Sequence, residues 1–267
     1  MGNRKHNDWQ RVAIAMPYLW LLLFFLTPFL LILKISLADP TVAMPPYTPA
    51  IGDDGNLQLT FDNFIFLFQD KLYALTYLKS LLMAAIATLC ALLLGYPMAY
   101  GIARAESRTS SVLLLLVILP FWISFLLRVY AWMGLMNNYG VINNILMWIG
   151  IIEQPLQIMY TDFAIFVGLT YSYLPFMILP LYANMEKLDG SLNEAAADLG
   201  SRPVNTFFRI TLPLTTPGIV AGCLLVFIPA TGEYVIPDLL GGGNVQMIGR
   251  VLYNEFSRNT DWPVASA

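Results

Sequence analysis

The sequence predicts an all-α polytopic membrane protein, on the basis of its composition and its long uncharged runs. Hydrophobic residues make up 58% of the 267 residues and charged residues only 12%, whereas a soluble domain carries about 25% charged residues. Several runs are long enough, at about 1.5 Å per residue, to cross a hydrocarbon core about 30 Å thick. We therefore expect lipid to surround much of the apolar surface.

The same composition excludes other classes of protein. The net charge of −3 gives no basic field for nucleic acid. Cys90 and Cys223 each lie inside an apolar run, and His6 is the single histidine. We therefore expect neither a disulfide framework nor a metal site.

Residues 1–36 are predicted to be an N-terminal flank and a first transmembrane helix. The run from Val12 to Leu33 is uncharged, and it is longer than the apolar core of about 7–15 residues in a cleaved signal peptide. Basic residues precede it: Arg4, Lys5 and Arg11. The proline- and glycine-rich residues 37–79 are predicted to form a periplasmic loop.

Residues 80–267 are predicted to form the core transmembrane domain. Four further spans are expected at about residues 81–103, 112–135, 163–183 and 216–240. Residues 141–152 are apolar at helical spacing but too short to cross, so we expect them to lie at the interface. Six prolines fall inside the spans, where they favour kinks: Pro97, Pro120, Pro175, Pro180, Pro229 and Pro237.

The segment from Trp262 is typical of the beginning of a sixth span. We expect this chain to lack the rest of a helix that its parent protein contains, through truncation or a natural deletion.

Basic residues in the flanks of the spans favour a cytoplasmic N-terminus. In that orientation the inner flanks carry Arg4, Lys5, Arg11, Arg104, Arg108, Lys187, Arg202 and Arg209. The longer outer loops carry Lys71, Lys79, Arg250 and Arg258. The loop 184–215 is then expected to be cytoplasmic.

That loop has the pattern of two short helices joined by a stiff turn. Ser191 and Glu194 are spaced as a capping box, in which each side chain would satisfy a free amide of the first helical turn. Gly200 is placed for a left-handed helix end, and Pro203 for the start of a second helix. We expect the turn to be exposed.

The loop also resembles a signature of known transporters. Glu194-Ala195-Ala196 is followed by Gly200 after three residues and by Ile210-x-Leu212-Pro213 after nine more. This is similar to the cytoplasmic "EAA" signature in permease subunits of binding-protein-dependent type I ABC importers. The resemblance implies contact with an ATPase through the following residues: Ser191, Glu194, Ala195, Ala196, Asp198, Gly200, Ile210, Leu212 and Pro213.

Three further segments resemble the spermidine/putrescine branch of that family, and within it the first permease subunit of putrescine importers. These are residues 112–134, 232–242 and 258–263, with Leu119-Pro120-Phe121-Trp122 in the first and Gly232-Glu233-Tyr234 in the second. The absence of a complete sixth span departs from the family pattern.

The resemblance implies the type I importer permease fold and a set of partners. A second homologous permease subunit, two ATPase subunits and a periplasmic substrate-binding protein would complete the importer in a bacterial inner membrane. The chain lacks the Walker A pattern, so ATP and Mg²⁺ would be used by the ATPase subunits and this chain would not be an enzyme.

Two charges are expected inside the membrane, Arg128 in the third span and Glu233 in the fifth, both nearer the outer face. An unpaired charge at mid-membrane costs about 2.5–3.5 kcal/mol on insertion scales. Pairing of the two residues, snorkelling of Arg128 to the interface, and separate roles in the substrate path are the open alternatives.

A path for a polycation needs anionic and aromatic surfaces that hold it weakly. The candidates are Glu233, Asp238, Arg128, Trp122, Tyr130, Trp132, Tyr171, Tyr173 and Tyr234. For most of the aromatic residues, interface anchoring or helix packing is an alternative interpretation.

Other functions fit less well. A secondary transporter would need a complete ion pathway and usually an internal repeat, and the sequence shows no repeat. An intramembrane enzyme would need a nucleophile with a base, or clustered histidines and carboxylates. Within the importer interpretation, putrescine, spermidine or another small cationic or organic solute remains open as the substrate.

Overall fold

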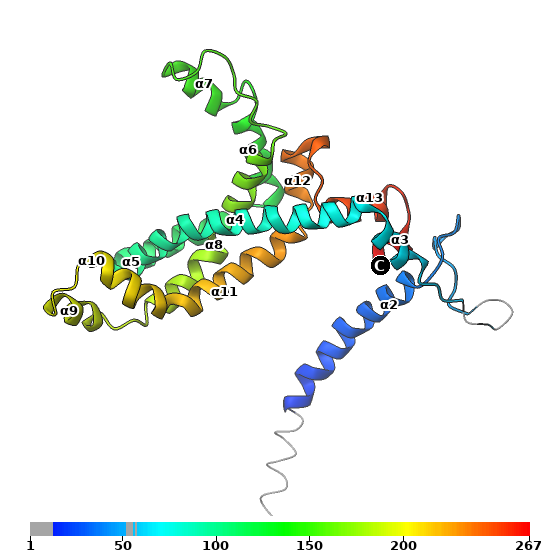
Figure 1. The fold of residues 1–267 in the computed structure, drawn as a ribbon, viewed down its shortest axis with the longest axis horizontal. Helices are drawn as coiled ribbons and strands as arrows, with labels where there is room; N and C mark the ends of the chain where they lie inside the picture. Colours follow the sequence, from blue (N-terminus) through cyan, green and yellow to red (C-terminus); the bar gives the residue numbers. More distant parts are fainter. Residues whose placement is uncertain (1–12, 52–55, 57) are drawn as a thin grey trace, which may run out of the picture. The chain divides into compact units, whose positions relative to one another are not determined.

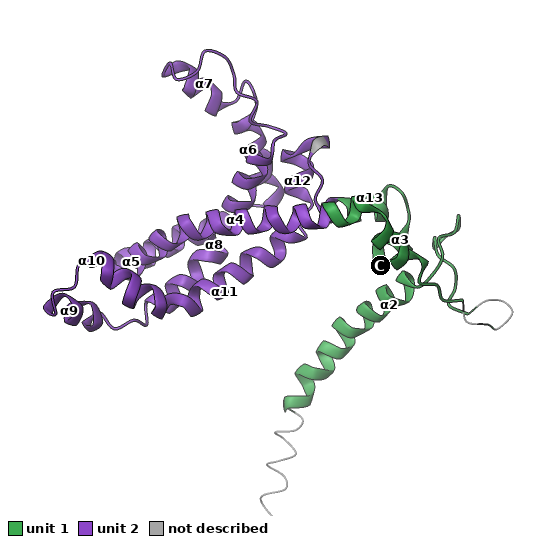
Figure 2. Cartoon of the chain, in the orientation of Figure 1, with its two compact units in different colours: residues 1–75, 251–267 green, residues 76–250 purple. Residues whose placement is uncertain are grey.

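The computed structural model describes residues 13–51, 56 and 58–267. Their regular secondary structure is helical, and one isolated β-bridge joins Pro40 and Tyr47. The basic flank Arg4, Lys5 and Arg11 lies outside the described residues. The chain divides into two compact units (Figure 2), one from residues 1–75 and 251–267 and the other from residues 76–250.

Four helices of the described residues are long and apolar enough to cross a membrane. They are Ala13–Ser36, α4 (Lys71–Arg104), α8 (Asp162–Met185) and Pro203–Thr231. A bent pair of helices, Ser107–Trp122 and Phe125–Trp148, gives a fifth if it is counted as one span. The prediction of an all-α membrane protein with five visible spans agrees with this architecture.

The first unit contains Ala13–Ser36, whose last turns form α2 (Thr27–Ser36), together with α3 (Asp62–Gln69) and α14 (Trp262–Ser266). The long helix is exposed along almost its whole length, as expected for a surface that faces lipid. Buried Asn63 donates to the carbonyl oxygens of Ser36 and Ala38, at 2.9 and 2.8 Å, and so fixes the chain where it leaves this helix.

α14 contacts α2 and α3, and the Asp261 side chain caps its first turn by accepting from the Val264 amide at 3.1 Å. A helix therefore begins at Trp262, where the sequence predicted the start of a further span.

The core of the second unit is the packing of α4, α8 and α11 (Leu212–Thr231), which lie along one another in Figure 1. Small residues permit this close approach, as is usual between helices in membranes. A Cβ at Gly218 would lie 2.8 Å from Asn184 Cβ, and one at Gly222 would lie 2.7 Å from Met177 Sδ. α8 is the most buried of the four candidate spans.

The second span is longer than predicted, because α4 begins at Lys71 inside the expected loop 37–79. The same loop also contains α3. The fourth span agrees well with its predicted bounds, since residues 163–183 were expected and α8 runs from Asp162 to Met185.

The third span is not the single helix predicted at residues 112–135. α5 (Ser107–Ile118) continues into a short 3-10 turn, Leu119–Trp122, and α6 (Phe125–Met136) starts after a break, with 93° between the two helical segments. Pro120 lacks an amide proton, and the backbone at Ile123 is extended. α7 (Val141–Trp148) is the short apolar helix expected within residues 141–152.

The fifth span also differs from the predicted residues 216–240. Its helix begins at Pro203, with α10 (Pro203–Thr206) and a π-helical turn (Phe207–Thr211), and it ends at Thr231. A non-helical segment, Gly232–Tyr234, then precedes α12 (Val235–Leu240). Hydropathy alone did not locate this end, because apolar residues resume at Val235 and Ile236 after the break.

The chain between α12 and α14 contains a short turn at Gly242–Asn244 and α13 (Ile248–Ser257). α12 packs against α8 closely enough that a Cβ at Gly168 would lie 2.6 Å from Leu240 Cδ1.

Candidate functional site

The segment Ser191–Pro213, here called the elbow, contains the residues predicted to contact an ATPase. Its first helix, α9 (Ser191–Asp198), lies at one end of the second unit together with α10 (Figure 1). Its second helix continues directly through α10 and the π-helical turn into α11. The elbow is therefore continuous with a membrane span.

The capping box predicted at Ser191 and Glu194 is wrong. The N-cap residue of α9 is Gly190, which has no side chain to cap the helix. The Ser191 amide instead donates to Asp189 Oδ1 at 2.9 Å, and this hydrogen bond from the Ser191 backbone lowers the pKa of the Asp189 carboxyl. Glu194 therefore does not cap the helix, and its side chain lies exposed.

The end of α9 is the left-handed cap predicted at Gly200. Gly200 has φ of 76°, its amide donates to the Ala197 carbonyl at 2.8 Å, and the Ser201 amide donates to the Ala196 carbonyl at 2.9 Å. These two bonds satisfy carbonyls that a helix end leaves free. They also fix the direction in which the chain leaves α9.

The second helix begins at Pro203, as predicted, and is tied back to the first. Thr211 Oγ1 donates to Asn193 Oδ1 across the turn at 3.4 Å. The π-helical turn ends just before Leu212-Pro213, where the missing amide of Pro213 interrupts regular α-helical bonding. Ile210 and Leu212 are half-buried, whereas Pro213 is exposed.

The outer surface of the elbow combines acidic and apolar residues. Ala195, Ala197 and Asp198 are exposed beside Glu194, whereas Ala196 is buried. Leu199 is 88% exposed and Val204 65%. The sequence interpretation did not select these two residues, although apolar side chains inside an exposed polar loop were a usable signal.

The second candidate region is the non-helical segment Gly232–Tyr234, here called the break. Glu233 accepts a hydrogen bond from the Tyr173 hydroxyl of α8 at 2.6 Å on Oε2, and one from the Val235 amide at 3.0 Å on Oε1. The second bond satisfies an amide at the start of α12. The structure thus joins two of the predicted path residues, Glu233 and Tyr173.

The ion pair proposed between Arg128 and Glu233 is not present. Arg128 is buried on α6, and its guanidinium lies 5.7 Å from the ring centroid of Phe121 and 5.6 Å from that of Phe125. Its Nε and Nη1 have no hydrogen-bond partner among the described residues. Because the side chain is buried, it does not snorkel to an exposed surface in this structure either.

Asp238, another path candidate, forms an ion pair with Arg250, with Oδ1 3.0 Å from Nε. Arg250 Nη1 also donates to the carbonyl oxygens of Gly242 and Val245. The guanidinium therefore neutralises Asp238 and holds the turn after α12.

The remaining aromatic candidates do not form one cluster. Trp132 and Tyr171 pack edge to face with ring centroids 5.3 Å apart, whereas Trp122 and Tyr130 are exposed. Tyr234 lies in the break itself and is partly exposed.

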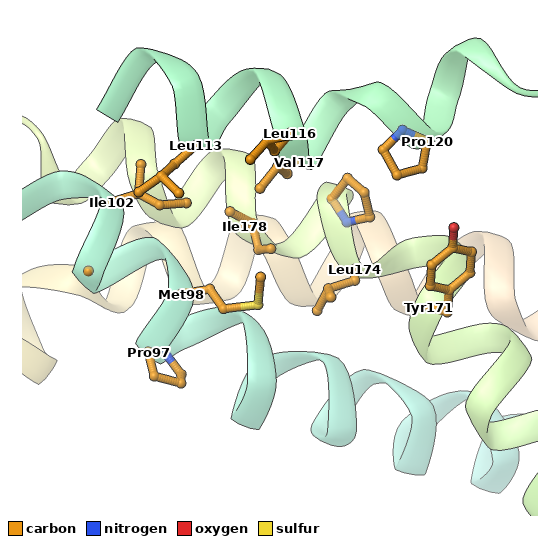
Figure 3. A pocket seen from close by; sticks show the side chains of 12 residues that line it. Pro97, Met98, Ile102, Leu113, Leu116, Val117, Pro120, Tyr171, Leu174 and Ile178 are labelled. Carbon is orange, nitrogen blue, oxygen red and sulfur yellow. The ribbon is translucent and has the colours of Figure 1, made fainter. Parts of the chain in front are cut away.

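A pocket of about 480 Å³ lies between α4, α5 and α8 (Figure 3). Its walls are almost wholly apolar, and Tyr171 is the one lining residue with a polar side chain. No carboxylate lines it, so this pocket does not suit a polycation. No group of histidine, cysteine or carboxylate side chains that could hold a metal ion occurs in the part of the chain that the structure describes.

Comparison with known proteins gives matches over almost the whole chain. The family described as "Binding-protein-dependent transport system inner membrane component" matches residues 91–267. The spermidine/putrescine transport system permease protein PotB of Haemophilus influenzae is 41% identical over 266 residues, which cover 98% of this chain and 88% of that protein. PotB of Escherichia coli is 42% identical over 251 residues, covering 93% and 86%.

A more distant relative is the inner membrane ABC transporter permease protein YdcU of Escherichia coli, 34% identical over 224 residues, which cover 79% of this chain and 70% of that protein. Among solved structures, a bacterial ABC transporter involved in the import of the acidic polysaccharide alginate has a TM-score of 0.70 at 19% identity, covering 98% of this chain and 88% of that chain. The same transporter in complex with an alginate pentasaccharide-bound periplasmic protein has a TM-score of 0.71. At this identity the likeness shows the fold alone.

Proposed function

Because the chain belongs to the family of binding-protein-dependent transport system inner membrane components, the permease subunits of ABC importers, we propose that it imports polyamines, putrescine or spermidine. The observation that carries this proposal is the 41% identity to a spermidine/putrescine permease over 98% of the chain. Import of another small cationic or organic solute is the alternative within the same family.

The proposed importer contains further subunits. A second homologous permease subunit completes the pore, two ATPase subunits bind on the cytoplasmic side, and a periplasmic substrate-binding protein delivers the polyamine. ATP and Mg²⁺ are used by the ATPase subunits. The chain crosses the bacterial inner membrane several times, with its N-terminus and its elbow in the cytoplasm.

The proposed mechanism is alternating access driven through the elbow. The elbow docks on an ATPase subunit with its exposed acidic and apolar residues, Glu194 and Leu199 among them. Closure of the ATPase dimer moves α9, and the hydrogen bonds at Gly200 and Asn193 transmit that movement to the second helix. Since this helix runs unbroken from Pro203 to Thr231, the movement reaches the break on the far side of the span.

Uptake of radiolabelled polyamine tests the function directly. In polyamine-deficient cells that lack their own importers, expression of this chain with its cognate partners should restore uptake of putrescine, spermidine or both. Unchanged polyamine uptake after deletion of this chain from the complete system would refute the substrate proposal.

The requirement for ATP separates an importer from a secondary transporter. Inactivation of the ATPase subunits should abolish uptake, because this chain carries no nucleotide-binding motif. Uptake that persists without ATP hydrolysis would favour the secondary transporter.

A further inference from the structure

We propose that Glu233 and Tyr173 form a subsite, at the end of the last span, that holds one primary ammonium group of the substrate. The inference rests on the proposed import of polyamines and adds to it the group that the substrate meets within the pore. The first observation behind it is the hydrogen bond of 2.6 Å that the Tyr173 hydroxyl donates to Glu233 Oε2.

No basic side chain of the described residues forms an ion pair with the Glu233 carboxylate. The ion pairs found among the described residues are Lys79 with Asp162 and Arg250 with Asp238. Glu233 receives hydrogen bonds from a hydroxyl and an amide, neither of which carries a charge. A half-buried carboxylate without a counterion attracts a cation from outside the chain.

The carboxylate is held in place and keeps acceptor positions that its two hydrogen bonds do not use. One hydrogen bond reaches each oxygen, from Tyr173 and from Val235. An ionised carboxyl group has about four acceptor positions, so each oxygen keeps a position for an N–H of an ammonium group. Hydrogen bonds to a charged acceptor are short and directional, and the two existing bonds fix the orientation of Glu233.

The backbone around Glu233 supports the same inference. The break separates the span Pro203–Thr231 from α12, and interrupted helices frequently form the ion and substrate sites of transporters. Gly249 packs directly on the break, because a Cβ at Gly249 would lie 2.3 Å from the Gly232 carbonyl oxygen. Space is open at Gly232 itself, since a Cβ there would meet no atom within 4 Å.

The other candidate places for an amine are less suitable. Asp238 and Asp162 already have cationic partners, and the pocket between α4, α5 and α8 has no carboxylate. Arg128 would repel an ammonium group. Glu233 is therefore the carboxylate in the helical core of the second unit that fits this role.

The test uses the complete importer in proteoliposomes, supplied with saturating polyamine-loaded binding protein. Glu233→Gln should reduce uptake by about tenfold or more, the loss expected when a charged hydrogen-bond partner is removed. ATP hydrolysis stimulated by the loaded binding protein should remain within about twofold of the wild type, because the elbow is unchanged. Glu233→Asp, which keeps the charge, should recover part of the uptake.

Tyr173→Phe should reduce uptake by about three- to fivefold, since a neutral hydrogen bond is lost and the carboxylate remains. Its matched control is Tyr96→Phe, which removes a hydroxyl hydrogen-bonded to Thr215 in the same unit and should leave uptake unchanged. Glu106→Gln removes an exposed carboxylate between α4 and α5 and controls for the change in net charge.

The outcomes separate this inference from the proposed function. If the wild-type importer does not transport polyamines, the proposed function fails. If the wild type transports them and Glu233→Gln retains uptake within about twofold, the subsite is wrong. If Glu233→Gln loses both uptake and ATP hydrolysis, the uptake of the Tyr173→Phe variant is the deciding measurement. A loss of uptake in Tyr173→Phe no larger than the loss in Tyr96→Phe overturns the inference.

Discussion

The chain leaves regular helical geometry on both sides of the same span, at the elbow before α11 and at the break after it. The elbow is exposed, and backbone hydrogen bonds at Gly200 shape its turn. In the break, Glu233 is half-buried, and contacts from distant residues shape the segment, Tyr173 through its hydroxyl and Gly249 by close approach. This difference fits the two proposed roles, in which the elbow transmits a movement and the break holds a ligand.

The largest effect is expected where added bulk would collide with the break. Gly249→Val would place a Cβ 2.3 Å from the Gly232 carbonyl oxygen and 2.8 Å from that of Glu233. Overpacking of this kind costs about 1–3 kcal/mol, and here it would also displace Glu233. We expect uptake to fall to near background while ATP hydrolysis by the reconstituted complex continues.

The control for this change is Gly243→Val, because a Cβ there meets open space. Equal uptake by the two variants would show that the position of the break does not matter for transport.

The next effect is at the turn of the elbow. Gly200 has φ of 76°, and a residue with a Cβ costs about 1–2 kcal/mol in that conformation. Gly200→Val should spare membrane insertion but uncouple ATP hydrolysis from transport, so that more ATP is used per polyamine imported. ATP hydrolysis and labelled polyamine uptake are measured on the same proteoliposomes.

Gly190→Val is the matched change for this position, because Gly190 has φ of −59° and open space around a Cβ. If Gly200→Val keeps the wild-type ratio of ATP to polyamine, the elbow does not need its rigid turn.

Reversal of the exposed charge on α9 should have a smaller effect. Glu194 caps nothing in the helix, so Glu194→Lys should leave α9 folded and weaken docking of the ATPase subunit. We expect reduced uptake with normal insertion, and recovery of fewer ATPase subunits with the purified complex. Glu106→Lys, an equal reversal at another exposed carboxylate, should copurify the ATPase normally; equal losses in both variants would argue against a specific contact.

The smallest effect concerns the start of α9. The pKa of the Asp189 carboxyl is lowered from its ordinary value because the carboxyl accepts a hydrogen bond from the Ser191 amide. Its stabilising contribution is therefore complete above the ordinary pKa and is lost as pH falls through the lower value. Asp189→Ala should increase hydrogen exchange in α9 by about twofold at neutral pH, whereas Asp189→Asn, which keeps an acceptor oxygen, should not.

The comparison of the two regions also explains what could be predicted from sequence. Gly200 and Pro203 act through their own backbone, so their roles were visible in the sequence. The capping box was wrong because Ser191 begins the helix and Asp189 supplies the acceptor, a difference of two positions that spacing rules do not resolve.

Contacts between residues far apart in the chain were harder to predict from the sequence. Glu233 was selected as a charge in a span, but its partner is a tyrosine of α8 and not Arg128. Hydropathy located α8 well and missed the bend after Pro120 and the end of the last span at Thr231. It reports how apolar a stretch is and not where its backbone changes direction.

A photo-crosslink from the elbow tests the central claim most directly. Leu199 on the elbow and Trp148 on α7 are each 88% exposed, so Leu199→Cys and Trp148→Cys can both carry a thiol-linked photo-crosslinker in the assembled complex. The account predicts an adduct with an ATPase subunit from position 199 and none from position 148, with a yield that changes when ATP is added. An ATPase adduct from position 148, or its absence from position 199 in a complex active in uptake, would contradict the account.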